Sequence, residues 1–177
     1  MYCMKCDGAM LTGMPQPPGM LIFFCGKMAA GKSTLSKTLA ARDGAVRLEQ
    51  DHFIATLFPG EVVDIASYVK HSSRIRQALT PHIGSLLSMG NNVVLDFPAN
   101  TRLQRAWFRE LFESAGAPHE LHYIEASDEL CKRQLRERSR HLPPGTPWTT
   151  EAEFDMIMAH FDPPGEDEGF HIIRHER

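Results

Sequence analysis

The sequence predicts an α/β domain, in which a parallel sheet carries helices on both faces. Short apolar segments alternate with amphipathic segments of helical period, which is the order that a parallel sheet with helical crossovers requires. The first apolar segment, MLIFFC over residues 20–25, has no polar position, as expected of a central strand covered on both faces. We therefore expect a single domain over residues 20–177.

The residues that follow the first strand predict a helix and a second strand. Leu35 and Leu39 lie four residues apart in a helical pattern over residues 33–42, and Gly44 stands where a helix commonly ends. The segment AVRLEQD then predicts a short strand that ends at Asp51.

The middle of the chain combines a long helical pattern with a third strand. Residues 61–89 carry apolar side chains on one stripe, and Pro81 either kinks a single helix or divides it in two. The segment NNVVLDF over residues 91–97 is apolar until Asp96, so we expect a strand with Asp96 at its end.

The C-terminal part continues the alternation. Residues 100–116 predict an amphipathic helix that Asn100 caps and Gly116 closes, with Leu103 on its buried face. The remaining predicted elements are, in order, a strand over residues 119–126, helices over residues 127–140 and 150–161, and a strand over residues 170–175.

Length and composition exclude several classes of protein. A chain of 177 residues can bury a core without disulfides or a structural metal. The formal net charge of −3 gives no global signal for nucleic acid. No apolar run approaches the ~20 residues of a membrane span and no signal-peptide core is present, so we expect a cytoplasmic protein without a membrane partner. The sequence does not determine the oligomeric state.

Residues 1–19 differ from the rest of the chain, because they are rich in Met, Gly and Pro. They contain Cys3 and Cys6 in a C-x-x-C pattern. A structural zinc site needs four ligands, and no second C-x-x-C follows. We expect a flexible N-terminal extension, with zinc binding between chains or redox chemistry of the cysteine pair as the alternatives.

A phosphate-binding motif follows the first strand. The eight residues GKMAAGKS match G-x-x-x-x-G-K-[ST] between a predicted strand and a predicted helix. Glycines at both ends of this P-loop let consecutive backbone N–H groups turn toward an anion, the lysine reaches the outer phosphates, and the serine hydroxyl is a ligand for Mg²⁺. We expect ATP with Mg²⁺ at Gly26, Lys27, Met28, Ala29, Ala30, Gly31, Lys32, Ser33 and Thr34.

Other sequence features separate the possible fates of the bound phosphate. A regulatory GTPase needs an N-K-x-D element, which is missing, and Asp96 is not followed by the D-x-x-G pattern. A motor ATPase commonly has a glutamate after the strand-end aspartate, where this chain has Phe97. A kinase needs an acceptor pocket, a base near the γ-phosphate and mobile arginines, and candidates for all three are present.

The chain resembles the group of P-loop kinases that includes chloramphenicol phosphotransferase, zeta-toxin sugar-nucleotide kinases, gluconate and shikimate kinases and the 5′-kinase domain of polynucleotide kinase. Many members are catalogued as AAA-family ATP-binding proteins. The resemblance rests on GKMAAGKST, LEQDHF, VVLDFPANT and CKRQLRERSR, and covers residues 21–174. It implies a fold like that of nucleoside-monophosphate kinases, with a lid at about residues 133–150 and adenine near the loop DPPGEDEG.

The resemblance also implies roles for individual residues. Asp51 would accept the proton of the attacking hydroxyl, although capping of the following segment also explains an aspartate there. Asp96 would hold Mg²⁺ through water, bond to Ser33 or touch the acceptor. Arg133 and Arg136 would act from the lid on the transferring phosphate, with a solvated helix face as the alternative.

The acceptor remains open at this stage. The expected pocket is lined by Phe53, Phe58, Tyr68, His71, Arg74 and Phe97, and Arg74 or Arg76 would contact a phosphate or carboxylate on the acceptor. An antibiotic, a sugar, a nucleoside and the 5′-hydroxyl of a nucleic-acid end are all compatible with these residues. The alternative function is an ATP-binding regulatory protein with slow hydrolysis and no acceptor.

Overall fold

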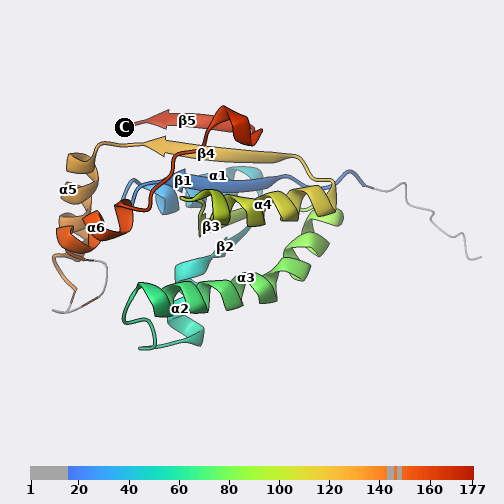
Figure 1. Cartoon of the computed structure of the whole chain (residues 1–177). Helices are drawn as coiled ribbons and strands as arrows, with labels where there is room; N and C mark the ends of the chain where they lie inside the picture. Colours follow the sequence, from blue (N-terminus) through green and yellow to red (C-terminus); the bar gives the residue numbers. More distant parts are fainter. Residues whose placement is uncertain (1–15, 143–145, 147–148) are drawn as a thin grey trace, which may run out of the picture.

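Five parallel strands form one sheet in the order β2-β3-β1-β4-β5 (Figure 1). The computed structural model describes residues 16–142, 146 and 149–177. The strands are β1 (Leu21–Gly26), β2 (Val46–Glu49), β3 (Val93–Pro98), β4 (His119–Glu125) and β5 (Ile172–Glu176). The predicted α/β class with a central first strand is confirmed.

Six α-helices and one short 3₁₀ helix accompany the sheet in the described part of the chain. The α-helices are α1 (Lys32–Asp43), α2 (Gln50–Leu57), α3 (Ile65–Ser88), α4 (Arg102–Ala115), α5 (Asp128–Ser139) and α6 (Glu151–Met158), and the 3₁₀ helix is η1 (Glu166–Glu168). Cys3 and Cys6, most of the predicted N-terminal extension and the proline-containing part of the predicted lid lie outside the described residues. No described helix is long and apolar enough to cross a membrane.

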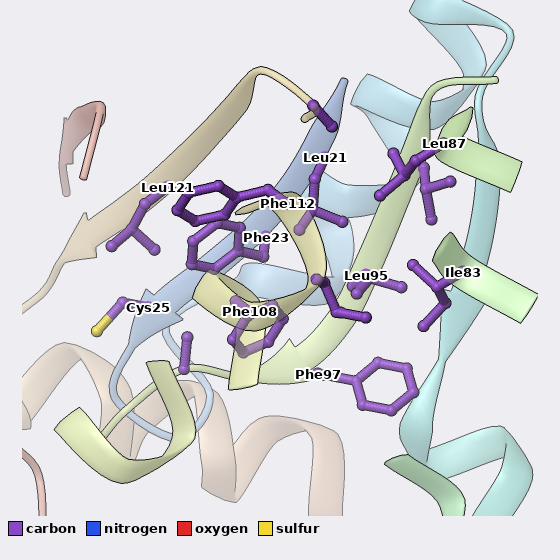
Figure 2. Close-up of a cluster of buried hydrophobic side chains, with 14 of the residues drawn as sticks. Leu21, Phe23, Cys25, Ile83, Leu87, Leu95, Phe97, Phe108, Phe112 and Leu121 are labelled. Atoms are coloured by element: carbon purple, nitrogen blue, oxygen red, sulfur yellow. The ribbon is translucent and has the colours of Figure 1, made fainter. Parts of the chain in front are cut away.

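The alternation of side chains along β1 builds a core on each face of the sheet. Leu21 and Phe23 are fully buried on the face that packs against α3 and α4, where Phe23 stacks on Phe108 with 4.4 Å between ring centroids (Figure 2). Ile22 and Phe24 point to the other face, in a cluster with residues of α1. Burial on both faces explains why this strand contains no polar residue.

Helix α3 continues through Pro81 as a single helix, which decides between the two alternatives predicted for this segment. Side-chain hydroxyls bond to carbonyl oxygens on either side of the proline, from Thr80 to Arg76 at 2.7 Å and from Ser85 to Pro81 at 2.9 Å. Figure 1 shows the helix bending in its C-terminal half, as expected where proline removes a backbone donor.

The beginning of α4 differs from the prediction in two ways. Thr101 caps the helix by accepting a hydrogen bond from the Gln104 backbone, whereas Asn100 bonds elsewhere, so the predicted cap is wrong. Leu103 is 84% exposed and does not lie on the buried face. The buried stripe instead passes through Arg105 and Phe108, and a polar residue on that stripe escapes a search for apolar periodicity.

Arg105 is fully buried and connects three segments of the chain. Its guanidinium donates to both carboxylate oxygens of Glu168, at 2.7 and 2.8 Å. It also donates to the carbonyl oxygens of Ala99 at 3.1 Å and Asp162 at 2.7 Å. Arg105 therefore fixes the loop before β5 against the end of β3.

We expect Arg105→Met to destabilise the fold by about 3–5 kcal/mol, because it leaves the Glu168 carboxylate and two carbonyl groups without their buried donor. Denaturant unfolding of the full chain measures this change. Arg102→Met is the control, since the Arg102 side chain is 56% exposed and pairs with Asp167 on the same loop. An equal loss of stability in the two variants would contradict the assignment.

Candidate active site

The turn between β1 and α1 has the backbone of a phosphate-binding loop. Positive φ angles occur at Gly26 (151°), Ala29 (61°) and Gly31 (102°). A Cβ at Gly26 would lie 2.9 Å from the carbonyl oxygen of Ile124, and one at Gly31 would overlap the guanidinium of Arg177. At Gly26 the close backbone contact and the positive φ both require glycine, whereas at Gly31 the positive φ favours glycine and the Arg177 side chain could move aside. Such turns direct successive backbone N–H groups toward an anion.

Lys32 begins α1 and reaches back into this turn. Its Nζ donates to the carbonyl oxygens of Gly26 at 2.5 Å and Lys27 at 2.8 Å. Burial lowers the pKa of Lys32, so its positive charge is held where water solvates it poorly. The N-terminus of α1 adds its own positive field at the same place.

Asp96, near the end of β3, is held by residues from α1 and β2. Its Oδ1 accepts a hydrogen bond from the Ser33 hydroxyl at 3.2 Å. Its Oδ2 accepts from the Ser36 hydroxyl at 3.0 Å and from the Arg47 guanidinium at 2.6 Å. Ser36 and Arg47 were not predicted, because their contacts depend on α1 packing on β3 and on β2 lying beside β3.

These residues fit a magnesium ion that is bound together with a nucleotide. The Ser33 hydroxyl and the Asp96 carboxylate are hard oxygen donors, the type that Mg²⁺ prefers. The described residues contain no group of three or more His, Cys, Asp or Glu suited to a metal. A site with few protein ligands is typical of Mg²⁺, which takes its other ligands from phosphates and water.

Asp51 occupies the first turn of α2, so the prediction that it ends a strand is wrong. The strand β2 stops at Glu49, which lies beside Asp96 in the sheet. Asp51 nevertheless faces the same cavity as the P-loop. Asp51 is exposed on its helix, but the surrounding cavity walls partly desolvate its carboxylate and raise its pKa; the nearby charges of Asp96 and Glu49 raise it further, while Arg138 opposes the rise.

A cavity of about 760 Å³ joins the P-loop to a space between α3, α4 and α6. It is lined by P-loop residues 28–34, by Asp51 and Asp96, and by Arg138 of α5. Its remaining walls are Ile65, Tyr68, Val69, Ser72, Arg76, Phe97, Pro98, Asn100, Thr101, Leu103, Gln104, Gln134, Ile157, Met158, His160 and Phe161. The cavity is thus large enough for a small molecule beyond the phosphate-binding turn.

The arginines of α5 point in different directions. Arg138 lines the cavity, and the negative charge of Asp51 acts on its guanidinium. Arg136 bonds to Glu151 of α6, and Arg133 is exposed on a face that does not line the cavity. Of these three arginines, Arg138 therefore lines the cavity, whereas Arg133 and Arg136 do not.

The expected acceptor residues divide into cavity and core. Tyr68 and Phe97 line the cavity, as does Arg76. The rings of Phe58 and His71 instead contact each other in a tilted arrangement with 4.1 Å between centroids, and His71 is buried. Phe53 packs against the core and Arg74 is exposed away from the cavity.

Two further contacts to the P-loop come from distant parts of the chain. Asn100 Oδ1 accepts a hydrogen bond from the Gly26 backbone N–H at 3.1 Å. Arg177 donates to the carbonyl oxygen of Ala30 at 3.0 Å. Arg177 also lines a second cavity of about 630 Å³ at the ends of β4 and β5, which adjoins the loop where the resemblance seats adenine.

Comparison with known families identifies the domain. A family model described as an AAA domain matches residues 21–164, which is most of the chain. The chain belongs to this family. The match begins with β1 and includes the P-loop and the whole cavity wall as far as α6. The AAA-domain assignment thus agrees with the resemblance to P-loop kinases.

Solved structures show that this AAA domain has a kinase-like P-loop fold. A presumed kinase of Chloroflexus aurantiacus superposes with a TM-score of 0.70 at 20% identity, covering 91% of this chain and 89% of the other. Kti12 of Chaetomium thermophilum in complex with ADP-AlF3 gives 0.63 at 15% identity, covering 87% and 88%. A gluconokinase of Sinorhizobium meliloti gives 0.57 at 17% identity, covering 91% and 83%. No curated protein matches the sequence significantly.

Proposed function

We propose that this protein is an ATP-dependent phosphotransferase that moves the γ-phosphate to a hydroxyl group of a small molecule. The observation that carries the proposal is the continuous cavity in which the P-loop, Asp51, Asp96 and Arg138 surround one end, while mainly apolar walls with Arg76 surround the other. The neighbouring structures support it, since a gluconokinase and an adenosine-phosphosulfate kinase solved with AMPPNP and APS share the fold.

Each residue has a distinct part in the proposed reaction. The P-loop and Lys32 bind the β- and γ-phosphates, and Arg138 faces the group that is transferred. Asp51 orients the acceptor hydroxyl and accepts its proton as the new O–P bond forms and the bond to the ADP leaving group breaks. Mg²⁺, held at Ser33 and Asp96, neutralises phosphate charge when it is bound.

A kinase and a slow ATPase give different results in a single assay. ADP release and compound mass are followed for the full chain with Mg²⁺ and ATP, with and without pooled hydroxyl compounds. We expect ADP release to depend on the pool, and one compound to gain the mass of one phosphate. Slow ADP release that is equal with and without the pool would reject the proposal in favour of a regulatory ATP-binding protein.

Arg138 and Arg133 provide a matched test of the arginine assignment. We expect Arg138→Ala to lower kcat by about 10²–10³-fold, because it removes positive charge from the transferring group, with a smaller effect on ATP affinity. Arg133→Ala should leave kcat nearly unchanged, since Arg133 does not line the cavity. Steady-state kinetics of both variants decide, and a larger loss in Arg133→Ala would reverse the assignment.

A further inference from the structure

The far half of the cavity is walled mainly by apolar side chains. The apolar groups on its lining include Ile65, Val69, Phe97, Leu103, Ile157 and Met158, which come from α3, β3, α4 and α6. Two of them remain open to solvent in the folded chain: Leu103 is 84% exposed and Val69 is 54% exposed. Exposed apolar groups that surround a concave site favour a ligand with apolar surface of its own.

One face of α3 forms a continuous wall of this half. Ile65, Tyr68, Val69, Ser72 and Arg76 lie at helical spacing and all line the cavity. Eight residues separate the arginine from the tyrosine, a distance of about 12 Å along the helix axis. The charges of Asp51 and Arg76 both act on Tyr68, so the tyrosine lies between the carboxylate near the P-loop and the arginine further along the wall.

Arg76 is the charged group of this apolar half, and it has no carboxylate partner among the described residues. Its guanidinium carbon lies 5.9 Å from the centroid of the Trp107 ring, which holds the side chain beside the cavity. Burial lowers the pKa of Arg76, so its charge is poorly solvated. An anionic ligand group would supply the missing counter-charge.

We propose that the acceptor is an amphipathic hydroxyl compound whose anionic group, a carboxylate or a phosphate, binds Arg76 while its apolar body covers the walls of α3, α4 and α6. This inference rests on the proposed function, which makes the molecule in the cavity a phosphate acceptor. It disfavours neutral sugars, which offer neither apolar surface nor charge. It also disfavours a nucleic-acid end, because the exposed apolar side chains of Val69 and Leu103 at the cavity would lie against a charged sugar-phosphate backbone.

A pair of fluorescent probes tests the site without any reaction. 1-Anilinonaphthalene-8-sulfonate is an apolar anion, and N-phenyl-1-naphthylamine has the same apolar body without the charge. With AMPPNP and Mg²⁺ present, we expect the anion to bind the full chain more tightly than the neutral probe. Arg76→Gln should weaken the anion about 10- to 100-fold and leave the neutral probe unchanged.

Arg74→Gln is the control, because Arg74 is an exposed arginine of the same helix that does not line the cavity. It should change the binding of neither probe. Equal affinities of the two probes for the unmodified chain, or an equal weakening of the anion by both substitutions, would overturn the inference.

A transfer assay separates this inference from the proposed function. Apolar hydroxycarboxylic acids, their methyl esters, neutral sugars and oligonucleotides with a 5′-hydroxyl are each incubated with Mg²⁺, ATP and the full chain. We expect the acids to gain phosphate with a kcat/KM that Arg76→Gln lowers toward that of the esters. Preferred phosphorylation of esters, sugars or oligonucleotides would reject the acceptor class and leave the kinase intact. Correct probe binding with no phosphorylation in any panel would reject the kinase and leave the anion site intact.

Discussion

Lys32→Ala is expected to weaken the binding of ATP with Mg²⁺ by about 10- to 100-fold, because it removes charge-assisted hydrogen bonds to the outer phosphates. Phosphate transfer should fall by about a further 10²–10³-fold, since the same ammonium faces the charge that develops during transfer. Calorimetric titration with AMPPNP measures the first change, and acceptor-dependent ADP release measures the second.

The matched control for this prediction is Lys37→Ala, which removes an exposed lysine from the same helix. It should bind nucleotide as the unmodified chain does. The melting temperature of each variant is measured on the same samples to exclude unfolding as the cause. Nucleotide affinity that Lys32→Ala leaves intact in a folded protein would contradict the role of the P-loop in this chain.

The P-loop and the strand before it could be predicted because their information is contiguous. Apolar residues over Leu21–Gly26, the two glycines and Lys32 lie within twelve positions, and local sterics decide the conformation. Capping of the later helices was also local: Ser127 accepts a bond from the Leu130 backbone, and Gly116 closes α4 with positive φ. Such features need no knowledge of which strands are neighbours.

The arginine that lines the cavity was harder to predict, because helical spacing alone gives several faces. Arg138 lies at the end of the stripe of the buried residues Cys131 and Leu135, where the side chain is exposed but lines the cavity. The apolar residues of that stripe can be recognised in the sequence, but most of the basic residues lie on the opposite face of α5. The buried apolar positions of a helix therefore indicate its inward face better than its charges do.

For a related reason, Leu103 was predicted on the buried face of α4 although it is exposed, and the burial of Arg105 was not predicted. Arg105 is buried because Glu168 and the carbonyl group of Asp162 come to it from a segment about sixty positions away, beside the nearby carbonyl group of Ala99. Leu103 is exposed because it borders the cavity and does not pack into the core. Both departures depend on long-range contacts that a single helical pattern does not encode, and both lie near the proposed active site.

Asp51→Asn should lower the rate of phosphate transfer by about 10²–10⁴-fold, because an amide cannot accept the proton of the acceptor hydroxyl. Nucleotide binding should remain, since Asp51 lines the cavity beyond the P-loop without being part of it. Single-turnover transfer and AMPPNP titration distinguish the two effects. The assignment of Asp51 as the base would be rejected if the variant bound nucleotide less tightly but still transferred phosphate at the unmodified rate from each ATP molecule that it bound.

The raised pKa of Asp51 predicts that Asp51→Asn, which lowers the transfer rate, should increase the stability of the fold. Because desolvation raises the pKa in the folded chain, the folded state holds the proton more tightly than the unfolded state does. Ionisation of Asp51 therefore costs stability as the pH rises from the ordinary aspartate value through the raised one. Asp51→Asn should raise the melting temperature at pH 7, and the gain should disappear in acid, at and below the ordinary aspartate pKa.

The same titration sets the acidic limit of activity, because only the carboxylate form accepts a proton. We expect kcat/KM of the unmodified chain to fall at a higher pH than an ordinary aspartate would give, and Asp51→Asn to lack that limb. Glu110→Gln, which changes an exposed carboxylate on α4, should alter neither the melting temperature nor the pH profile. If Asp51→Asn stabilises the fold but stops phosphate transfer, Asp51 serves the reaction and not the fold. An Asp51→Asn variant that is less stable than the unmodified chain at pH 7 would instead show that Asp51 has a structural role.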